Sequence, residues 1–189
     1  MIRILKNFLS NDEIKSLNNW CLNNYTENFF NGTTMDPRYP RSRLTTRSNG
    51  YNTKNINYPK ESYQIQKKLL NALDIKNPLY PPPFCNGIVN GIGFEPGSIF
   101  CHIDPIYFKD TFTLHCNFIT QKSADGGVTI IEGVPYDVDE SDCLCYVVSN
   151  LKHEVLPIIG TTPRILWCFG FCITQNELKN IFNCQSNEV

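Results

Sequence analysis

The sequence of 189 residues lacks the segments that mark membrane-bound and secreted proteins. No apolar run approaches the roughly 20 residues that a membrane-spanning helix needs. The apolar stretch from Met1 to Lys6 is too short for a secretory signal and has no small-residue cleavage pattern. The chain also has neither a polybasic nor a strongly acidic tail, and its formal net charge is -1. We therefore expect a soluble, cytoplasmic protein that does not bind a membrane.

The nine cysteines include no pair of CxxC units, the spacing that is typical of structural zinc sites. Their number is odd, and Cys143 and Cys145 alternate with apolar residues in Cys143-Leu144-Cys145-Tyr146-Val147-Val148. Such alternation is typical of a buried strand whose thiols pack as small apolar groups. We therefore expect reduced, buried cysteines and no structural zinc site.

The length predicts one domain over residues 1–189, because a chain of this size can bury an ample core. We expect an N-terminal strand, helices and a mobile basic loop in 1–84, a β-rich core in 85–173, and a C-terminal helix and tail in 174–189. Capping boxes at Ser10-Asn11-Asp12-Glu13 and Thr174-Gln175-Asn176-Glu177 predict the starts of two helices. The first should run to about Asn24, and another helix should begin at Pro59.

Strands dominate the prediction for the second half of the chain. Short apolar or alternating runs between turn residues predict strands at 88–92, 98–103, 111–119, 127–131, 144–148, 154–158 and 163–173. The acidic stretch 134–142 reads as a solvated loop. About eight short strands with helices gathered early predict a mainly β fold with flanking helices and a double-stranded β-helix core, of the jelly-roll or cupin-like kind.

The last predicted strand has two different faces, because strand side chains alternate. The bulky residues Ile165, Trp167, Phe169 and Phe171 share one face, and Arg164, Leu166, Cys168 and Gly170 share the other. We expect the bulky face to pack beneath the helices and the small face to line a cavity.

Only three histidines are present, and two of them belong to a metal-binding pattern. In Cys101-His102-Ile103-Asp104-Pro105 an extended segment places His102 and Asp104 on one face. His153, which follows Asp104 by 49 residues, can return to that face from a neighbouring strand. Two imidazoles and one carboxylate on one side of a metal form the facial arrangement of non-haem Fe(II) oxygenases. Arg164 adds a fixed cation that suits a carboxylate ligand.

The surrounding motifs extend this pattern. They are Gly93-Phe94-Glu95-Pro96-Gly97-Ser98-Ile99-Phe100-Cys101-His102-Ile103-Asp104, Asp125-Gly126-Gly127, and His153-Glu154-Val155-Leu156-Pro157 followed by Arg164. With them, roughly residues 85 to 173 resemble the Fe(II)/2-oxoglutarate-dependent dioxygenases, and most closely the prolyl-hydroxylase type. The resemblance implies a double-stranded β-helix, Fe(II) held by His102, Asp104 and His153, and 2-oxoglutarate held by Arg164. It also implies O2 as a substrate and ascorbate as a stimulant.

Other polar residues are candidates for the cosubstrate or the substrate. Family members often carry tyrosines near Phe94 and Phe118, so Asn90, Thr113 or Asn117 is expected to assist Arg164 instead. His115 suits a contact near the metal or with substrate, or a satisfied place in the core. The basic loop 31–59 is either a solvated surface loop or a lid that attracts an anionic substrate. In the second case Arg38, Arg41 and Arg43 would contact the substrate.

The resemblance implies hydroxylation of a C–H bond in a peptidyl or free amino acid, with release of succinate and CO2. Family members that halogenate have a small residue where this chain keeps Asp104, so hydroxylation is favoured. A small-molecule biosynthetic hydroxylase and an AlkB-type nucleic-acid demethylase are alternatives. The second is disfavoured because no arginine follows Arg164. A catalytically silent jelly-roll binding module is the third alternative.

Overall fold

The computed structural model describes residues 1–28, 30–31, 43–46 and 56–183. Its largest sheet has seven strands in the order β1-β10-β6-β13-β4-β3-β2. These strands are β1 (Ile2–Leu5), β2 (Phe30–Asn31), β3 (Arg43–Thr45), β4 (Ile88–Gly93), β6 (Thr111–Gln121), β10 (Cys143–Val147) and β13 (Arg164–Thr174). All of its pairings are antiparallel.

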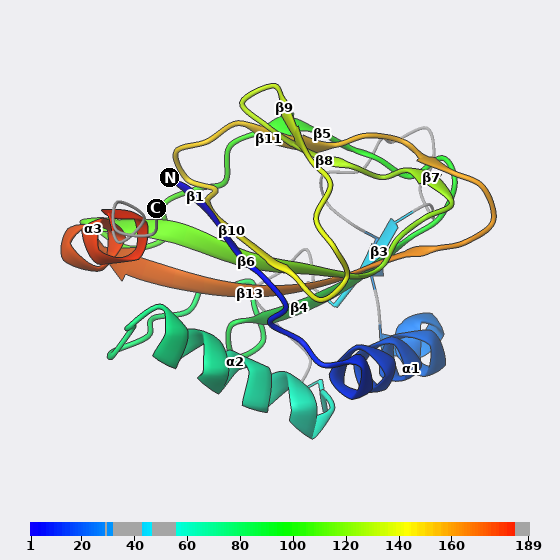
Figure 1. The fold of residues 1–189 in the computed structure, drawn as a ribbon, viewed down its shortest axis with the longest axis horizontal. Helices are drawn as coiled ribbons and strands as arrows, with labels where there is room; N and C mark the ends of the chain where they lie inside the picture. The colour runs from blue at the N-terminus through cyan, green and yellow to red at the C-terminus, as the bar shows by residue number, and fades with distance from the viewer. Residues whose placement is uncertain (29, 32–42, 47–55, 184–189) are drawn as a thin grey trace.

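A smaller sheet lies over one face of the large one (Figure 1). It has the order β5-β11-β8-β9, and a two-stranded ladder β12-β7 accompanies it. These strands are β5 (Ile99–His102), β7 (Asp125–Gly126), β8 (Thr129–Ile131), β9 (Val134–Tyr136), β11 (His153–Val155) and β12 (Ile158–Ile159). The two facing antiparallel sheets confirm the predicted double-stranded β-helix core.

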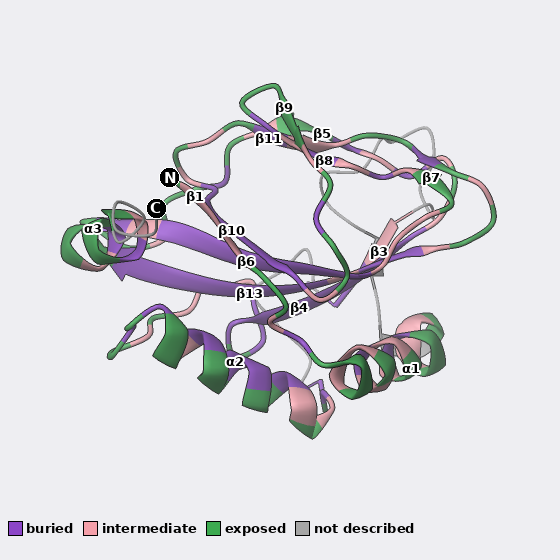
Figure 2. Ribbon diagram, in the orientation of Figure 1, coloured by how far each residue is buried: buried purple, intermediate pink, exposed green. Residues whose placement is uncertain are grey.

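The other face of the large sheet packs against α1 (Asn11–Asn28) and α2 (Lys60–Ala72), and α3 (Gln175–Asn183) lies at one end (Figure 1). Strands β6 and β13 are buried along almost their whole length (Figure 2). The bulky face of β13 behaves as predicted, because Ile165, Trp167, Phe169 and Phe171 all join the core on the helix side. The order of layers is therefore helices, large sheet, small sheet.

Both predicted capping boxes form. The backbone N–H of Ser10 donates to the Glu13 carboxylate at 2.8 Å, and the Glu13 N–H donates to the Ser10 hydroxyl at 3.3 Å. Thr174 and Glu177 make the same reciprocal pair at 2.8 and 3.3 Å. The first helix extends beyond the expected end near Asn24 and reaches Asn28. The helix expected from Pro59 is confirmed, with Pro59 as its N-cap.

Two segments expected to be loops contain strands instead. In the acidic stretch 134–142, β9 pairs with β8 through a two-residue turn at Glu132 and Gly133, whose φ angles are 50° and 79°. Positive φ at both positions is the tight hairpin geometry that matches strand twist. Within the predicted loop 31–59, β3 pairs with β4 on one side and with the two-residue edge strand β2 on the other. Strands of two or three residues have too little pattern of their own to be visible in the sequence.

No helix in the described ranges combines the length and the apolar character that crossing a membrane requires.

We expect Phe169→Ala to lower the free energy of unfolding by about 3–5 kcal/mol, because it leaves a cavity in a close-packed core. Phe169 is fully buried and packs edge-on against Phe118, with ring centroids 5.8 Å apart. Urea denaturation measures the change. Phe100→Ala is the matched control, because its side chain is 50% exposed and its loss should change stability by less than about 0.5 kcal/mol. Equal effects of the two substitutions would contradict the assigned core.

Candidate active site

The small sheet brings the two motif histidines together. His102 on β5 lies opposite His153 on β11, and their ring centroids are 4.2 Å apart. From this pair to the pair Ile99–Val155, β5 advances three residues and β11 only two. The extra residue is a β-bulge, which lets Ile99 and His102 both line the cavity while Phe100 and Cys101 stay exposed.

The donor atoms of His102, Asp104 and His153 all lie within 4.8 Å of one another. The Nδ1 atom of His102 is 2.7 Å from the Phe100 carbonyl oxygen, and that of His153 is 3.1 Å from the Leu151 carbonyl oxygen. A carbonyl oxygen can only accept, so each Nδ1 carries the proton and each Nε2 presents its lone pair. Orientation of this kind by a backbone carbonyl is typical of metal-binding histidines. The donor set therefore fits a divalent iron ion.

Asp104 lies between two imidazoles. One carboxylate oxygen is 3.5 Å from Nε2 of His102, and the other is 3.6 Å from Nε2 of His115. Its backbone N–H donates to the Val148 carbonyl oxygen at 3.0 Å, which attaches the segment after β5 to the end of β10. The carboxylate is thus held on the same side as the two histidines, as the His-x-Asp spacing predicts.

The ionisation of these groups suits a metal. Burial by itself would raise the pKa of Asp104, but the hydrogen bond that a protonated His102 ring donates to it and the charge of the nearby imidazolium rings hold that pKa well below its usual range. Burial acts to lower the pKa of His102, yet the contacts with Asp104 and the Phe100 carbonyl raise it above its ordinary value. Burial and the charge of His102 lower the pKa of His153. At neutral pH the carboxylate is therefore ionised.

Arg164 is buried in the same cavity, at the start of β13. Its Nη2 atom donates to the Thr129 hydroxyl at 3.2 Å, and its Nε atom has no partner among the described residues. Burial, with help from the charge of Arg43, lowers the pKa of Arg164 to about 10, so it stays charged at neutral pH. No ion pair joins it to a carboxylate in the described part of the chain. A buried cation without a counter-charge is costly, so the site fits an anionic ligand.

The register of the large sheet explains why two arginines reach this cavity. Arg43 on β3 and Arg164 on β13 are both paired with Gly93, from opposite sides of β4. Partners in register project to the same face of a sheet, and glycine leaves space between them. Gly127 has a related role, because a Cβ there would lie 2.9 Å from Cδ of Arg164, and its φ is +65°.

Several other candidates also line the cavity. His115 and Asn117 project into it from β6, and Arg43 projects from β3. The structure adds Tyr146 and Thr129, which the sequence analysis did not identify. The Asn117 amide donates to the Tyr146 hydroxyl at 3.2 Å.

Tyr146 is opposite His115 on β6, and its ring packs edge-on against His153 with centroids 5.4 Å apart. The alternation in 143–148 could have placed it on the face away from Cys143 and Cys145. Only the register shows that this face is the cavity.

Two candidates do not line the cavity. Asn90 is paired with Trp167 and therefore projects to the helix side of the sheet, where its amide donates to the Leu166 carbonyl oxygen at 2.8 Å. The expected role of Asn90 at the cosubstrate is not supported by this placement. Thr113 donates its hydroxyl to the Pro105 carbonyl oxygen at 3.0 Å, so it fixes the segment after Asp104. Arg38 and Arg41 lie outside the described residues.

Binding of Mn(II), a redox-stable substitute for Fe(II), should weaken as the pH falls through the pKa of His102. Protons and metal compete for the same Nε2 atom, and the raised pKa of His102 lets protons compete from a higher pH. Below that pKa the affinity should fall by about tenfold per pH unit. Calorimetry between pH 8 and 5.5 measures this. His115→Gln should keep the profile, and an affinity that is constant with pH would exclude His102 as a ligand.

The sequence matches no protein-family model, and no curated protein matches it. A prolyl-4-hydroxylase from Pseudomonas putida is similar with a TM-score of 0.62 at 13% identity, over 92% of each chain. A Trichoplax adhaerens prolyl hydroxylase, solved with a hypoxia inducible factor peptide, has a TM-score of 0.61 at 14% identity, over 99% of this chain and 87% of that one.

HygX from Streptomyces hygroscopicus, solved with nickel and 2-oxoglutarate bound, has a TM-score of 0.62 at 10% identity, over 92% of this chain and 83% of that one. At such low identity these similarities establish the fold. The chain has the jelly-roll fold of these structures.

Proposed function

We propose that the protein is an Fe(II)- and 2-oxoglutarate-dependent dioxygenase that hydroxylates a C–H bond and releases succinate and CO2. One observation carries the proposal. Three oriented metal donors and a buried arginine without a carboxylate partner, among the described residues, line the same cavity. The shared fold supports it, because the similar structures include one with 2-oxoglutarate bound.

Each part of the cavity then has a task. His102, Asp104 and His153 would hold Fe(II) and leave about three positions for other ligands. The Arg164 guanidinium would bind the distal carboxylate of 2-oxoglutarate, with Thr129, Tyr146 and Asn117 as neighbouring polar groups. When bound, the iron with 2-oxoglutarate and O2 supplies the oxidising chemistry, and ascorbate would keep the metal ferrous.

The protein's contribution is the enclosure as well as the ligands. The walls of the cavity include apolar side chains, namely Phe84, Val89, Ile99 and Leu166. Such walls exclude water and strengthen the attraction between Arg164 and a carboxylate. Family members that halogenate have a small residue at the position of Asp104, which frees a metal site for chloride. The carboxylate of Asp104 would take that site here, and this supports hydroxylation.

The substrate is proposed to be an amino-acid side chain, free or in a peptide, with an anionic group. Arg43 supports the charge preference, because it lines the cavity beside the metal donors. Its charge acts to lower the pKa of His102 and His153, which places positive potential at that wall. A substrate carboxylate or phosphate would be attracted to this wall by the same potential.

Anaerobic addition of Fe(II) and then 2-oxoglutarate should produce a visible metal-to-ligand charge-transfer band, because the cosubstrate chelates the iron. Asp104→Ala should abolish the band by removing a ligand. Asp137→Ala is the matched control, because this carboxylate is 70% exposed and pairs only with Lys122 among the described residues. No band in folded, iron-loaded protein would overturn the proposal and favour a silent binding module.

Arg164→Ala should weaken 2-oxoglutarate binding by about 100-fold while leaving the affinity for Mn(II) nearly unchanged. The physical reason is the loss of a buried charge pair, which typically costs about 2–5 kcal/mol. Titration of the band with 2-oxoglutarate measures the first effect, and calorimetry measures the second. Succinate release stimulated by amino acids, peptides or oligonucleotides would then identify the substrate class, including the nucleic-acid and small-molecule alternatives.

A further inference from the structure

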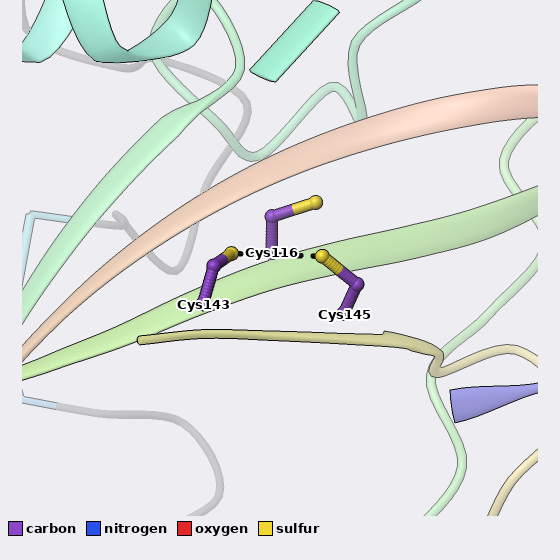
Figure 3. Close-up of side chains that lie close together, drawn as sticks. All are labelled: Cys116, Cys143 and Cys145. Atoms are coloured by element: carbon purple, nitrogen blue, oxygen red, sulfur yellow. Dashed lines mark hydrogen bonds between the residues drawn. The ribbon is translucent and has the colours of Figure 1, made fainter. Parts of the chain in front are cut away.

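Three cysteines converge on the helix side of the large sheet, away from the cavity. Cys116 lies on β6, and Cys143 and Cys145 lie on β10. All three are fully buried in the core that the sheet forms with the helices. Figure 3 shows the sulfur atoms of Cys143 and Cys145 turned toward each other beside Cys116.

The strand register makes this cluster. Cys145 is paired with Cys116, and Cys143 is two residues earlier on β10, so all three project from the same face. The Val148 N–H donates to the Thr113 carbonyl oxygen, which makes Thr113 and Val148 a hydrogen-bonded pair of the ladder. Such pairs alternate, so Cys116 and Cys145 form a non-hydrogen-bonded pair, whose side chains lie closest.

The three sulfur atoms lie within 4.8 Å of one another, and those of Cys143 and Cys145 are 3.5 Å apart. Three sulfur ligands at about 2.3 Å from one metal ion lie about 4.0 Å apart in a trigonal plane and about 3.8 Å apart in a tetrahedron. The spacing of the cluster is therefore close to that of thiolates around one ion, with small side-chain rotations.

A positive charge lies near the cluster. Arg3 on β1 is paired with Cys145, and its guanidinium donates to the Ile181 carbonyl oxygen of α3 at 3.2 Å. Hydrogen bonds from Cys116 and Cys143, and the charge of Arg3, lower the pKa of Cys145 below its ordinary value. Burial instead raises the pKa of Cys116 and Cys143.

The cluster is separate from the proposed active site. Cys116 lies between His115 and Asn117, and Cys145 precedes Tyr146, but these three neighbours project to the cavity on the opposite face. The three thiols and the metal donors of the cavity, His102, Asp104 and His153, are also two spatially separate groups of possible ligands. A ligand at the thiols would therefore not compete with iron for His102 or His153.

We propose that Cys116, Cys143 and Cys145 form a three-sulfur site for one soft metal ion, with Cu(I) as the ion that fits best. Thiolate sulfur selects soft ions such as Cu(I) and Zn(II) over hard ones. The group contains no fourth donor among the described residues. A structural zinc ion needs four ligands in a tetrahedron, whereas a trigonal Cu(I) ion needs only three. Each thiol that binds as a thiolate releases one proton, the copper stays monovalent, and Arg3 offsets part of the negative charge.

The reduced protein, titrated anaerobically with Cu(I) in the presence of bicinchoninate as competitor, should retain one Cu(I) per chain. Thiolate-to-copper absorption in the ultraviolet should rise with it, and X-ray absorption should show three sulfur neighbours. Cys145→Ala should weaken retention by more than the 10–100-fold that loss of an outer partner causes, because it removes a ligand. A parallel titration with Zn(II) against EDTA should show no retained zinc.

Cys172→Ala is the matched control, because this thiol is also buried but projects from the opposite face of β13. It should retain copper as the unchanged protein does. Circular dichroism checks that each variant folds, and Cys143→Ala replaces Cys145→Ala if the latter does not. The proposal would be overturned if the protein does not retain copper, or if X-ray absorption shows nitrogen neighbours. Unchanged retention in both Cys145→Ala and Cys143→Ala would also overturn it. Retention of zinc alone would overturn the trigonal assignment.

Discussion

A guanidinium enclosed between two sheets is the constraint on which the proposed chemistry depends. Arg164 keeps its charge although it is buried, and within the described chain it contacts a hydroxyl rather than a carboxylate. The folded protein therefore contains a buried positive charge that an external anion can neutralise. The fold supports this arrangement with glycines at 93 and 127, which leave the long side chain room beside the strands.

The central strands separate packing from chemistry by their alternation. On β13 the aromatic residues face the helices, while Arg164, Leu166 and Cys168 face the small sheet. On β6 the apolar residues Leu114 and Phe118 join the helix-side core, while His115 and Asn117 face the cavity. Most of the stabilising apolar surface thus lies on one side, and a polar cavity on the other does not interrupt it.

Patterns within a single segment could be predicted from the sequence. Both capping boxes, the two faces of β13 and the shared face of His102 and Asp104 depend on neighbours a few residues apart. Features that depend on pairing between distant segments could not. Asn90 faces the helices because it is in register with Trp167, Arg43 reaches the cavity through β3, and Tyr146 lies beside His153 because β10 pairs with β6. Their local sequences are compatible with either face.

The bulge in β5 has a consequence for folding. An uninterrupted ladder from the pair Ile99–Val155 would turn His102 outward, because a shift of one residue reverses the face of every side chain. An ion held jointly by His102 and His153 would bridge two strands and permit only the bulged alignment. The proposed catalytic metal would then also select one register between β5 and β11. Removal of the metal would allow other registers of these two short strands.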